Sequence, residues 1–255
     1  MIILISPAKT LDFTQNNLVS EGSQPMFQEE SEILIKKLRT LSRKKIGQLM
    51  DISPQLAELN YDRYQNWSPE FEVPAAKQAV LAFKGDVYLG LQAETFVQEE
   101  FDFAQQHLRI LSGLHGLLKP LDLIRPYRLE MGTQLPVRRK KNLYQFWGDK
   151  ITENLNNLLE NEENPVVINL ASQEYFKSIN LKKLNAKVIT PVFKDFKNGD
   201  YKVLSFFAKK ARGFMSAYVI KNKINDPEKL KLFQEEGYSY NDLQSEGNEW
   251  VFTRG

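Results

Sequence analysis

Residues 208–213, with the sequence AKKARG, place three cationic side chains among small residues, a composition suited to binding an anion. The segment follows the apolar run 203–207 and enters a helical pattern, so we expect Lys209 and Arg212 to share one helix face. Cations near a helix amino terminus oppose the helix dipole by roughly 0.3–1 kcal/mol, which a bound anion would offset. The segment therefore predicts part of a phosphate site, and a solvated charge run is the alternative.

Five apolar runs are followed by short turns that contain serine, glycine or charged residues. These turns cover residues 6–10, 85–86, 112–113, 171–172 and 208–213. Ligands of α/β proteins bind beyond the carboxyl ends of the strands, where free backbone N–H groups can approach an anion closely. Any one turn can simply reverse the chain, but five of them predict a shared site. The residues expected to bind phosphate there are Ser6, Lys9, Lys84, Lys209, Lys210 and Arg212.

A second basic cluster lies in residues 117–133, where two prolines make the backbone rigid. Arg125, Arg128 and Glu130 alternate with apolar residues, and arginine forks suit phosphate groups. We add both arginines to the predicted phosphate site. Glu130 either orients an arginine or acts as a general base.

Several side chains could perform catalysis if the cleft is an active site, although no catalytic residue is assigned. No histidine is suitably placed for a Ser–His–Asp triad, whereas a serine–lysine pair of Ser172 with Lys9 or Lys209 stays open. Ser172 is also expected to be a helix N-cap. The candidates are Lys9, Asp86, Glu130 and Ser172.

Residues 49–57 resemble a helix-hairpin-helix element, in which a short turn donates backbone N–H groups to a DNA phosphate. We expect two short helices joined by a tight turn at 50–51, with Ser53 as N-cap and Pro54 at the first helical position. Asp51 and Ser53 replace the usual hairpin glycines. The residues assigned to this element are Lys44, Lys45, Leu49, Ile52 and Ser53.

The elements that must position these residues follow from hydrophobic periodicity. We expect strands at 1–5, 80–83, 108–111, 166–170, 188–193, 201–207 and, as a closing edge strand, 248–253. We expect helices at 26–41, 92–106, 143–160, 172–178 and 208–221, a further helix opening at 226–228, and a loop over 12–25. The pattern predicts a mixed α/β (α+β) fold, a single compact domain over 1–255 with a central mixed sheet. A helical insertion over about 26–72 carries the hairpin element.

Composition narrows the possible functions. The 34 Lys and Arg nearly balance the 32 Asp and Glu, so any basic surface must come from their distribution. The absence of cysteine excludes disulfides, thiolate chemistry and cysteine-ligated metal clusters. His107 is expected to pack at a strand start and His115 to be more exposed, and two histidines cannot form a multi-histidine metal site. We predict no metal, no cofactor and no membrane span, and a cytoplasmic location.

Seven segments together resemble the YaaA family of bacterial proteins, which is linked to resistance to peroxide stress. They are residues 4–11, 83–88, 111–118, 126–133, 146–148, 169–172 and 208–213. The resemblance implies a cytosolic protein with an unusual mixed α/β fold and a positively charged cleft. It also implies DNA binding, helped by a helix-hairpin-helix element, and a role in limiting damage from hydroperoxide and free iron.

Two functions therefore stay open at this point, and whether the protein is an enzyme is undecided. The first is a DNA-binding protein that contacts the phosphates of double-stranded or distorted DNA. The second is an enzyme that acts on a nucleotide, a nucleoside or damaged DNA in the basic cleft, with a nucleotide-like small molecule as a partner. Iron sequestration is a weaker hypothesis, because no dense cluster of Glu and His is present.

Overall fold

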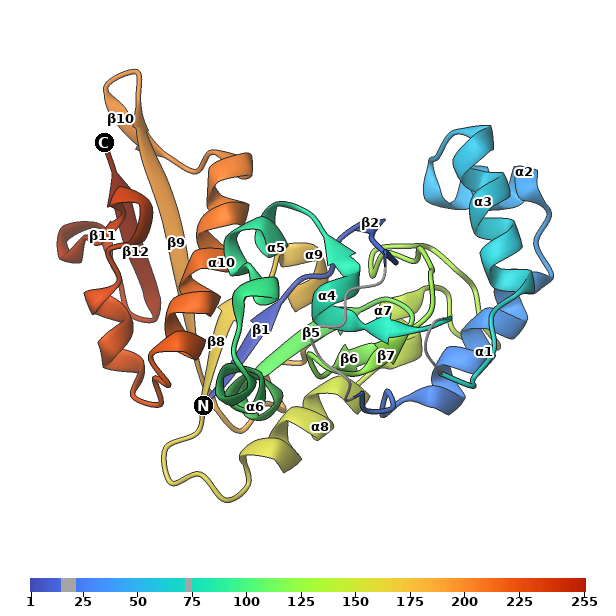
Figure 1. Cartoon of the computed structure of the whole chain (residues 1–255), viewed down its shortest axis with the longest axis horizontal. Coiled ribbons are helices and arrows are strands. Elements are labelled where there is room, and N and C mark those ends of the chain that lie inside the picture. The colour runs from blue at the N-terminus through green and yellow to red at the C-terminus, as the bar shows by residue number, and fades with distance from the viewer. Residues whose placement is uncertain (15–21, 72–74) are drawn as a thin grey trace.

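A computed structural model of the chain describes residues 1–14, 22–71 and 75–255. A central eight-stranded sheet has the order β11-β12-β9-β8-β1-β5-β6, and β10 pairs with β9 (Figure 1). The strands are β1 (Ile2–Ile5), β5 (Leu108–Ser112), β6 (Gly116–Leu118), β8 (Val166–Leu170), β9 (Lys187–Lys197), β10 (Asp200–Lys202), β11 (Ser239–Tyr240) and β12 (Glu249–Arg254). The fold is mixed α/β with a central mixed sheet, as predicted.

The middle of the sheet is parallel and buried. β1 pairs in parallel with β5 on one side and β8 on the other, and β8 continues in parallel to β9 and β12. Every residue of β1, β5 and β8 is buried. Uninterrupted apolar runs suit this position, because a central parallel strand is covered on both faces.

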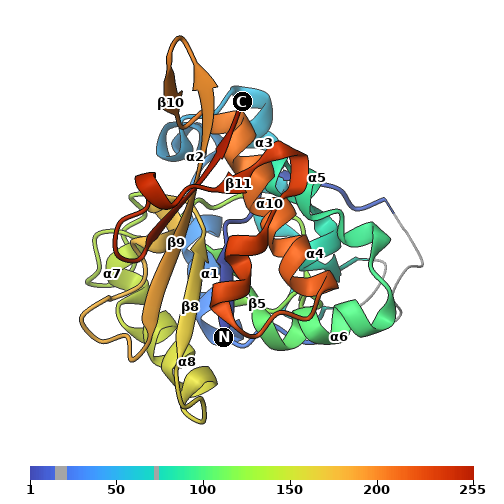
Figure 2. The same ribbon diagram turned by 90° about the vertical axis from the view of Figure 1, so that its left-hand side faces the viewer.

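Helices cover both faces of the sheet. In Figure 2, α5, α6 and α10 lie on one side of β8 and β9, and α7 and α8 lie on the other. The bounds of the helices around the sheet are α5 (Asp86–Leu91), α6 (Gln98–His107), α7 (Leu143–Trp147), α8 (Lys150–Leu159), α9 (Gln173–Phe176) and α10 (Ser205–Lys221). Short 3-10 helices cover Ala93–Thr95, Pro227–Leu232, Glu235–Gly237 and Asp242–Gln244.

Two small ribbons and one short helix connect the sheet to the rest of the molecule. β2 (Thr10–Leu11) pairs antiparallel with β4 (Phe83–Lys84), and β3 (Lys77–Gln78) pairs antiparallel with β7 (Leu123–Ile124). The helix α4 (Ala79–Ala82) lies directly before β4. The β2–β4 pairing brings the turn after β1 beside Lys84.

The helices α1 (Gln28–Arg39), α2 (Arg43–Met50) and α3 (Pro54–Gln65) lie at the end of the molecule opposite to β11 and β12 (Figure 1). Ser53 Oγ accepts the Leu56 N–H at 3.3 Å, so the predicted N-cap is confirmed. Asp51 closes α2 in the left-handed region, at φ 50°. The two predicted short helices and their tight turn are therefore present, while their use as a helix-hairpin-helix element stays a prediction.

The sequence predictions were correct for the central strands and wrong at four places. Residues 80–82 form part of helix α4 rather than a strand, since the alanines at 79 and 82 favour a helix and pack in the core. The predicted strand 201–207 ends at Lys202, and residues 205–207 begin α10. The predicted helix 143–160 is broken by Gly148, whose φ of 52° ends α7. The strand predicted at 248–253 corresponds to β12, but it does not close the sheet, because β11 pairs with it on the outer side.

Other predicted elements are confirmed in part. Helix 92–106 is a 3-10 turn followed by α6, and the loop over 12–25 includes residues 15–21, which lie outside the described part of the chain. The insertion predicted over about 26–72 ends at a residue that also lies outside the described ranges.

His115 is buried rather than exposed. Its Nδ1 lies 3.0 Å from Ser31 Oγ, and its ring packs edge-on against Tyr127. Burial lowers the pKa of His115 to about 3, so the ring is neutral at physiological pH. His107 is the last residue of α6, where its ring stacks on Phe103 and its Nδ1 lies 2.9 Å from the Met1 carbonyl oxygen.

Candidate functional site

A polar cleft of about 310 Å³ opens beyond the carboxyl ends of β1 and β8. Four of the five predicted turn segments contribute to its lining, and the fifth, at residues 112–113, does not. Ser112 is instead buried, with its hydroxyl 2.6 Å from Tyr127 Oη. The predicted site residues that line the cleft are Ser6, Lys9, Lys84, Asp86, Ser172, Lys209 and Arg212.

The topology of the sheet explains why a cleft forms at this place. From β1 the chain adds β5 on one side, and it later returns to add β8, β9 and β12 on the other side. The crevice between β1 and β8 is therefore the point where the strand order reverses. In open α/β sheets, ligands bind in the crevice beyond the strands at such a point.

Two serines join the ends of β1 and β8. The Ser172 N–H donates to Ser6 Oγ at 2.8 Å, and Ser6 Oγ donates to Ser172 Oγ at 3.3 Å. Ser172 occupies the N-cap position of α9, but its hydroxyl makes no cap hydrogen bond. Tyr88 Oη donates to the Ser6 carbonyl oxygen at 3.1 Å and so helps to hold the turn after β1. Within the described residues, no hydrogen bond links the Ser172 hydroxyl to a lysine, so the serine–lysine pair is not formed.

Lys209 and Arg212 share a face of α10, as predicted, and both line the cleft. The reason they do so differs from the prediction. Because α10 begins at Ser205, residues 208–213 lie inside the helix, and their backbone N–H groups bond within it. Lys209 lies beyond the first turn, where the dipole penalty has faded. The segment therefore contributes side chains to the cleft, and its backbone N–H groups are not free to bind a ligand.

Arg212 has no anionic partner in the described part of the chain. Its side chain is half-buried, and burial is the cause that lowers its pKa. None of the described residues forms an ion pair or a hydrogen bond with its guanidinium group. Lys209 Nζ, in contrast, lies 4.0 Å from Asp86 Oδ2 at the start of α5. Buried charges are normally paired, so an unpaired cation in a cleft is suited to an anionic ligand.

Lys9, Arg128 and Glu130 form a charged wall beside the cleft, and of the three only Lys9 belongs to the cleft lining. Glu130 Oε1 accepts from Arg128 Nε at 3.0 Å and lies 3.7 Å from Lys9 Nζ. Glu130 Oε2 is buried and has no hydrogen-bond partner among the residues that the structure describes. This arrangement supports the interpretation in which Glu130 orients an arginine. The guanidinium of Arg128 is therefore already occupied by a carboxylate.

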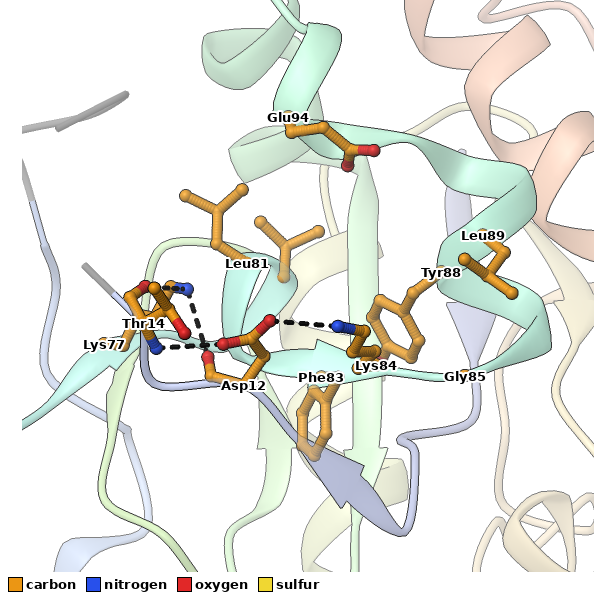
Figure 3. Close-up of a pocket in the computed structure, with 11 residues that line it drawn as sticks. Asp12, Thr14, Lys77, Leu81, Phe83, Lys84, Gly85, Tyr88, Leu89 and Glu94 are labelled. Atoms are coloured by element: carbon orange, nitrogen blue, oxygen red, sulfur yellow. Dashed lines mark hydrogen bonds and ion pairs between the residues drawn. The ribbon is translucent and has the colours of Figure 1, made fainter. Parts of the chain in front are cut away.

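Lys84 joins the cleft to a neighbouring hollow of about 350 Å³. In Figure 3 its ammonium group points toward Asp12, and Lys84 Nζ lies 3.2 Å from Asp12 Oδ2. The Thr14 N–H and Lys84 together hold the pKa of Asp12 well below its usual value. Buried Lys77 donates from Nζ to the carbonyl oxygens of Asp12 and Thr14, at 3.0 and 2.9 Å.

Three predicted phosphate residues lie outside the cleft lining, namely Arg128 of the charged wall, Arg125 and Lys210. Arg125 donates from Nη2 to the Glu70 carbonyl oxygen at 2.7 Å. Lys210 Nζ lies 5.0 Å from the centre of the Phe214 ring. The hairpin residues also lie elsewhere, because α2 and α3 stand at the far end of the molecule (Figure 1).

Sequence reasoning missed several residues of the site. Tyr88, Glu174 and Tyr175 line the cleft, and Glu174 Oε1 accepts the Gly132 N–H at 3.0 Å. Arg63 of α3 lies near Arg128: burial, and then the charge of Arg128, lower its pKa. The signal for Tyr88 was its position three residues after Gly85, on the first turn of an unpredicted helix. No sequence pattern predicts that Arg63 lies near Arg128, because the two residues are far apart in sequence and meet only when the chain folds.

Tyr64 connects the hairpin helices to this wall. Its hydroxyl donates to the carbonyl oxygen of Arg128, and burial raises its pKa far above the usual value. Arg39 of α1 donates from Nε to the Tyr64 carbonyl oxygen at 2.8 Å and holds the end of α3. The hairpin helices are therefore held against the segment that contains Arg128 and Glu130.

Metal and membrane features can be stated only for residues 1–14, 22–71 and 75–255. Within these ranges, no group of three or more His, Cys, Asp or Glu side chains is arranged to hold a metal ion. No helix within them has the length and apolar composition needed to cross a bilayer.

The fold and the cleft define a mixed α/β protein with a polar, cation-lined cleft at the point where the strand order of its sheet reverses. A family model described as peroxide stress protein YaaA matches residues 1–244. A UPF0246 protein of Teredinibacter turnerae (strain ATCC 39867 / T7901) is 55% identical over 254 residues, covering 100% of this chain and 99% of the relative. The chain belongs to the YaaA family of peroxide stress proteins, and the resemblance inferred from its segments is confirmed.

Proposed function

We propose that this protein binds DNA through phosphate groups held in the cleft, and that it acts in the cytoplasm in the response to hydroperoxide. The unpaired guanidinium of Arg212 is the observation that carries the proposal. Family membership supports the peroxide role. Limiting iron-dependent damage is the effect we infer, because a protein that covers DNA phosphates competes with metal ions for them.

The charges around the cleft favour an anionic ligand. Lys9 and Lys209 are exposed at its rim, with 67% and 52% of their side-chain surface accessible. Asp86 and Glu174 are the acidic residues of the lining, but Glu174 is engaged by a backbone N–H. Phosphate contacts of this kind carry little sequence information, so we expect weakly sequence-specific binding of double-stranded or distorted DNA.

A second basic surface supports the same partner. Lys44 and Lys45 are exposed in the first turn of α2, at the opposite end of this helix from the turn at Asp51. We propose that this hairpin contacts the backbone of a duplex whose other contacts lie at the cleft. Arg63 of α3 lies near Arg128 and adds a cation on the side of α3 that faces the charged wall.

Replacing both Lys209 and Arg212 by alanine is expected to weaken binding of a 20-base-pair duplex by about tenfold or more at low salt. Because two phosphate contacts are lost, the slope of log affinity against log salt concentration should fall by about two. Fluorescence anisotropy at two or more salt concentrations measures both quantities. The matched control is the Lys182→Ala and Lys187→Ala pair, two exposed lysines near the opposite, amino-terminal end of β9.

Binding that does not change with salt would contradict the proposal. So would an equal loss of affinity in the control pair, because the phosphate contacts would then not be confined to the cleft. The variant proteins should retain the thermal unfolding midpoint of the wild type, since Lys209 and Arg212 make no described contact that holds the core together.

A second candidate function is an enzyme that acts on a nucleotide, a nucleoside or damaged DNA. It is favoured by the hydroxyl groups of Ser6 and Ser172 in the cleft lining, beside acidic and basic side chains. The test is to incubate the protein with free nucleotides and with duplexes carrying oxidised bases, and to separate the products by chromatography. Product that disappears with Ser172→Ala supports this function, and no product from any of these substrates contradicts it.

A further inference from the structure

A cluster of exposed apolar side chains lies where the β9–β10 hairpin meets the start of α10. We call it the aromatic patch and define it as Val203, Phe206 and Phe207, which are 53%, 56% and 41% exposed. All three lie within five residues of sequence. Burying a phenylalanine side chain stabilises a protein by about 1.5–3 kcal/mol, so leaving several at one place is unfavourable unless a ligand covers them.

The rings of the patch are partly ordered by one another. Phe206 and Phe207 are edge to face, with their ring centres 5.6 Å apart. The guanidinium of Arg254 lies 4.7 Å from the centre of the Phe207 ring and is paired with Asp195. These contacts position Phe207, whereas Phe206 presents the larger accessible surface.

Cationic side chains interleave with these rings. Lys197 and Lys202 are exposed on the β9–β10 hairpin, and Lys209 and half-buried Lys210 follow Phe207 on α10. Asp200 is the acidic residue of the hairpin turn. Rings set among lysines are suited to nucleic acid, because every base has a face for stacking and every nucleotide carries a phosphate.

The aromatic patch is continuous with the cleft. Phe206 lies three residues before Lys209, so both side chains lie on one face of α10, about 4.5 Å apart along the axis. Lys209 lines the cleft together with Arg212. A nucleotide whose phosphate is held by these cations can therefore place its base against Phe206.

We propose that the aromatic patch is a stacking surface for unpaired nucleobases, with Phe206 as its main contact and with phosphates held by Lys209 and Arg212. This inference rests on the proposed DNA binding and names the form of DNA bound at this end of the cleft. A duplex cannot use the patch, because its bases are stacked on one another. A second copy of the chain fits poorly, since it would bring the lysines of both patches together.

The test compares two strands that have the same phosphates and differ only in their bases. One is twelve thymidine nucleotides, and the other has the same length with abasic residues throughout. Stacking of one base contributes enough to change affinity by about tenfold, so the thymidine strand should bind at least about tenfold more tightly than the abasic strand. Phe206→Ala should remove most of this difference, while the affinity for the abasic strand stays within about twofold.

A tryptophan at position 206 provides a direct readout. Phe206→Trp should keep the preference for bases, and its exposed indole should be quenched by the thymidine strand and not by the abasic strand. The native Trp67, Trp147 and Trp250 are buried and supply a constant background. Leu243→Ala removes an even more exposed apolar side chain outside the aromatic patch and serves as the control, with unchanged affinity for both strands.

Equal affinities for the two strands would overturn this inference and leave the phosphate contacts intact. Loss of concentration-dependent self-association in Phe206→Ala, with unchanged strand affinity, would also overturn it and assign the patch to a contact between copies. If neither strand nor a duplex binds at any salt concentration, the proposed DNA binding itself is wrong.

Discussion

Replacing Gly213 by alanine is expected to lower the free energy of unfolding by about 3 kcal/mol, the largest effect we predict for a single methyl group. A Cβ at this position would overlap the Val87 carbonyl oxygen and would lie 2.7 Å from the Leu91 nitrogen and 2.9 Å from the Gly90 carbonyl carbon. All three are backbone atoms of α5, so no side-chain rotation can relieve the overlap. The helices α5 and α10 would have to separate.

Urea denaturation followed by circular dichroism measures this effect. Gly47→Ala is the matched control, because Gly47 also lies inside a helix and a Cβ there would meet Ala57 Cβ at a comfortable 3.4 Å. Alanine favours a helix over glycine by roughly 0.5–1 kcal/mol, so this control should be slightly stabilising. If Gly213→Ala unfolds at the wild-type urea concentration, the close approach of α5 and α10 is wrong.

Gly213 has a role in helix packing, whereas the sequence suggested that the whole AKKARG segment binds phosphate. The glycine is required where α10 crosses α5, near Gly90, whose own Cβ would overlap the Lys210 carbonyl oxygen. The small residues therefore serve packing, and the cations serve the cleft. Separation of α5 from α10 would also move Asp86 away from Lys209, so packing at the glycine holds the rim of the cleft in place.

The sequence was sufficient to predict the core strands and insufficient at element boundaries. Ile2–Ile5 and Val166–Leu170 are apolar runs of strand length, and their burial on both faces made them recognisable. The run 203–207 looked like a strand for the same reason. In the structure Val203 precedes α10, Phe206 and Phe207 lie in its first turn, and all three are exposed, because periodicity reports apolar character and not what covers it.

The site was predictable to the extent that it depends on strand ends. Ser6 and Ser172 follow neighbouring parallel strands, and the structure joins them by hydrogen bonds. Arg125 and Arg128 looked equivalent in sequence, yet one binds a backbone carbonyl group and the other binds Glu130. Which partner a long cationic side chain reaches depends on tertiary contacts, and no spacing rule encodes them.

Replacing Arg128 by methionine is expected to destabilise the protein by about 3 kcal/mol, because it leaves the carboxylate of Glu130 buried with fewer partners. The two side chains are 15% and 14% exposed, and Arg128 Nη2 lies 2.8 Å from Glu130 Oε1. Lys9 is mostly exposed at 3.7 Å and compensates weakly. The Tyr64 hydrogen bond reaches the Arg128 backbone, so methionine leaves it in place.

A double-mutant cycle isolates the pair, since Glu130→Gln removes the charge and keeps the shape. The combined Arg128→Met and Glu130→Gln variant should recover much of the stability lost in Arg128→Met, as measured by urea denaturation. Strict additivity of the two single changes would show that the pair does not interact. DNA affinity separates the roles of the arginines: because Glu130 already occupies the Arg128 guanidinium, Arg128→Met should reduce duplex binding less than Arg212→Ala does. The opposite order would make Arg128 the main phosphate ligand and Glu130 a group that DNA displaces.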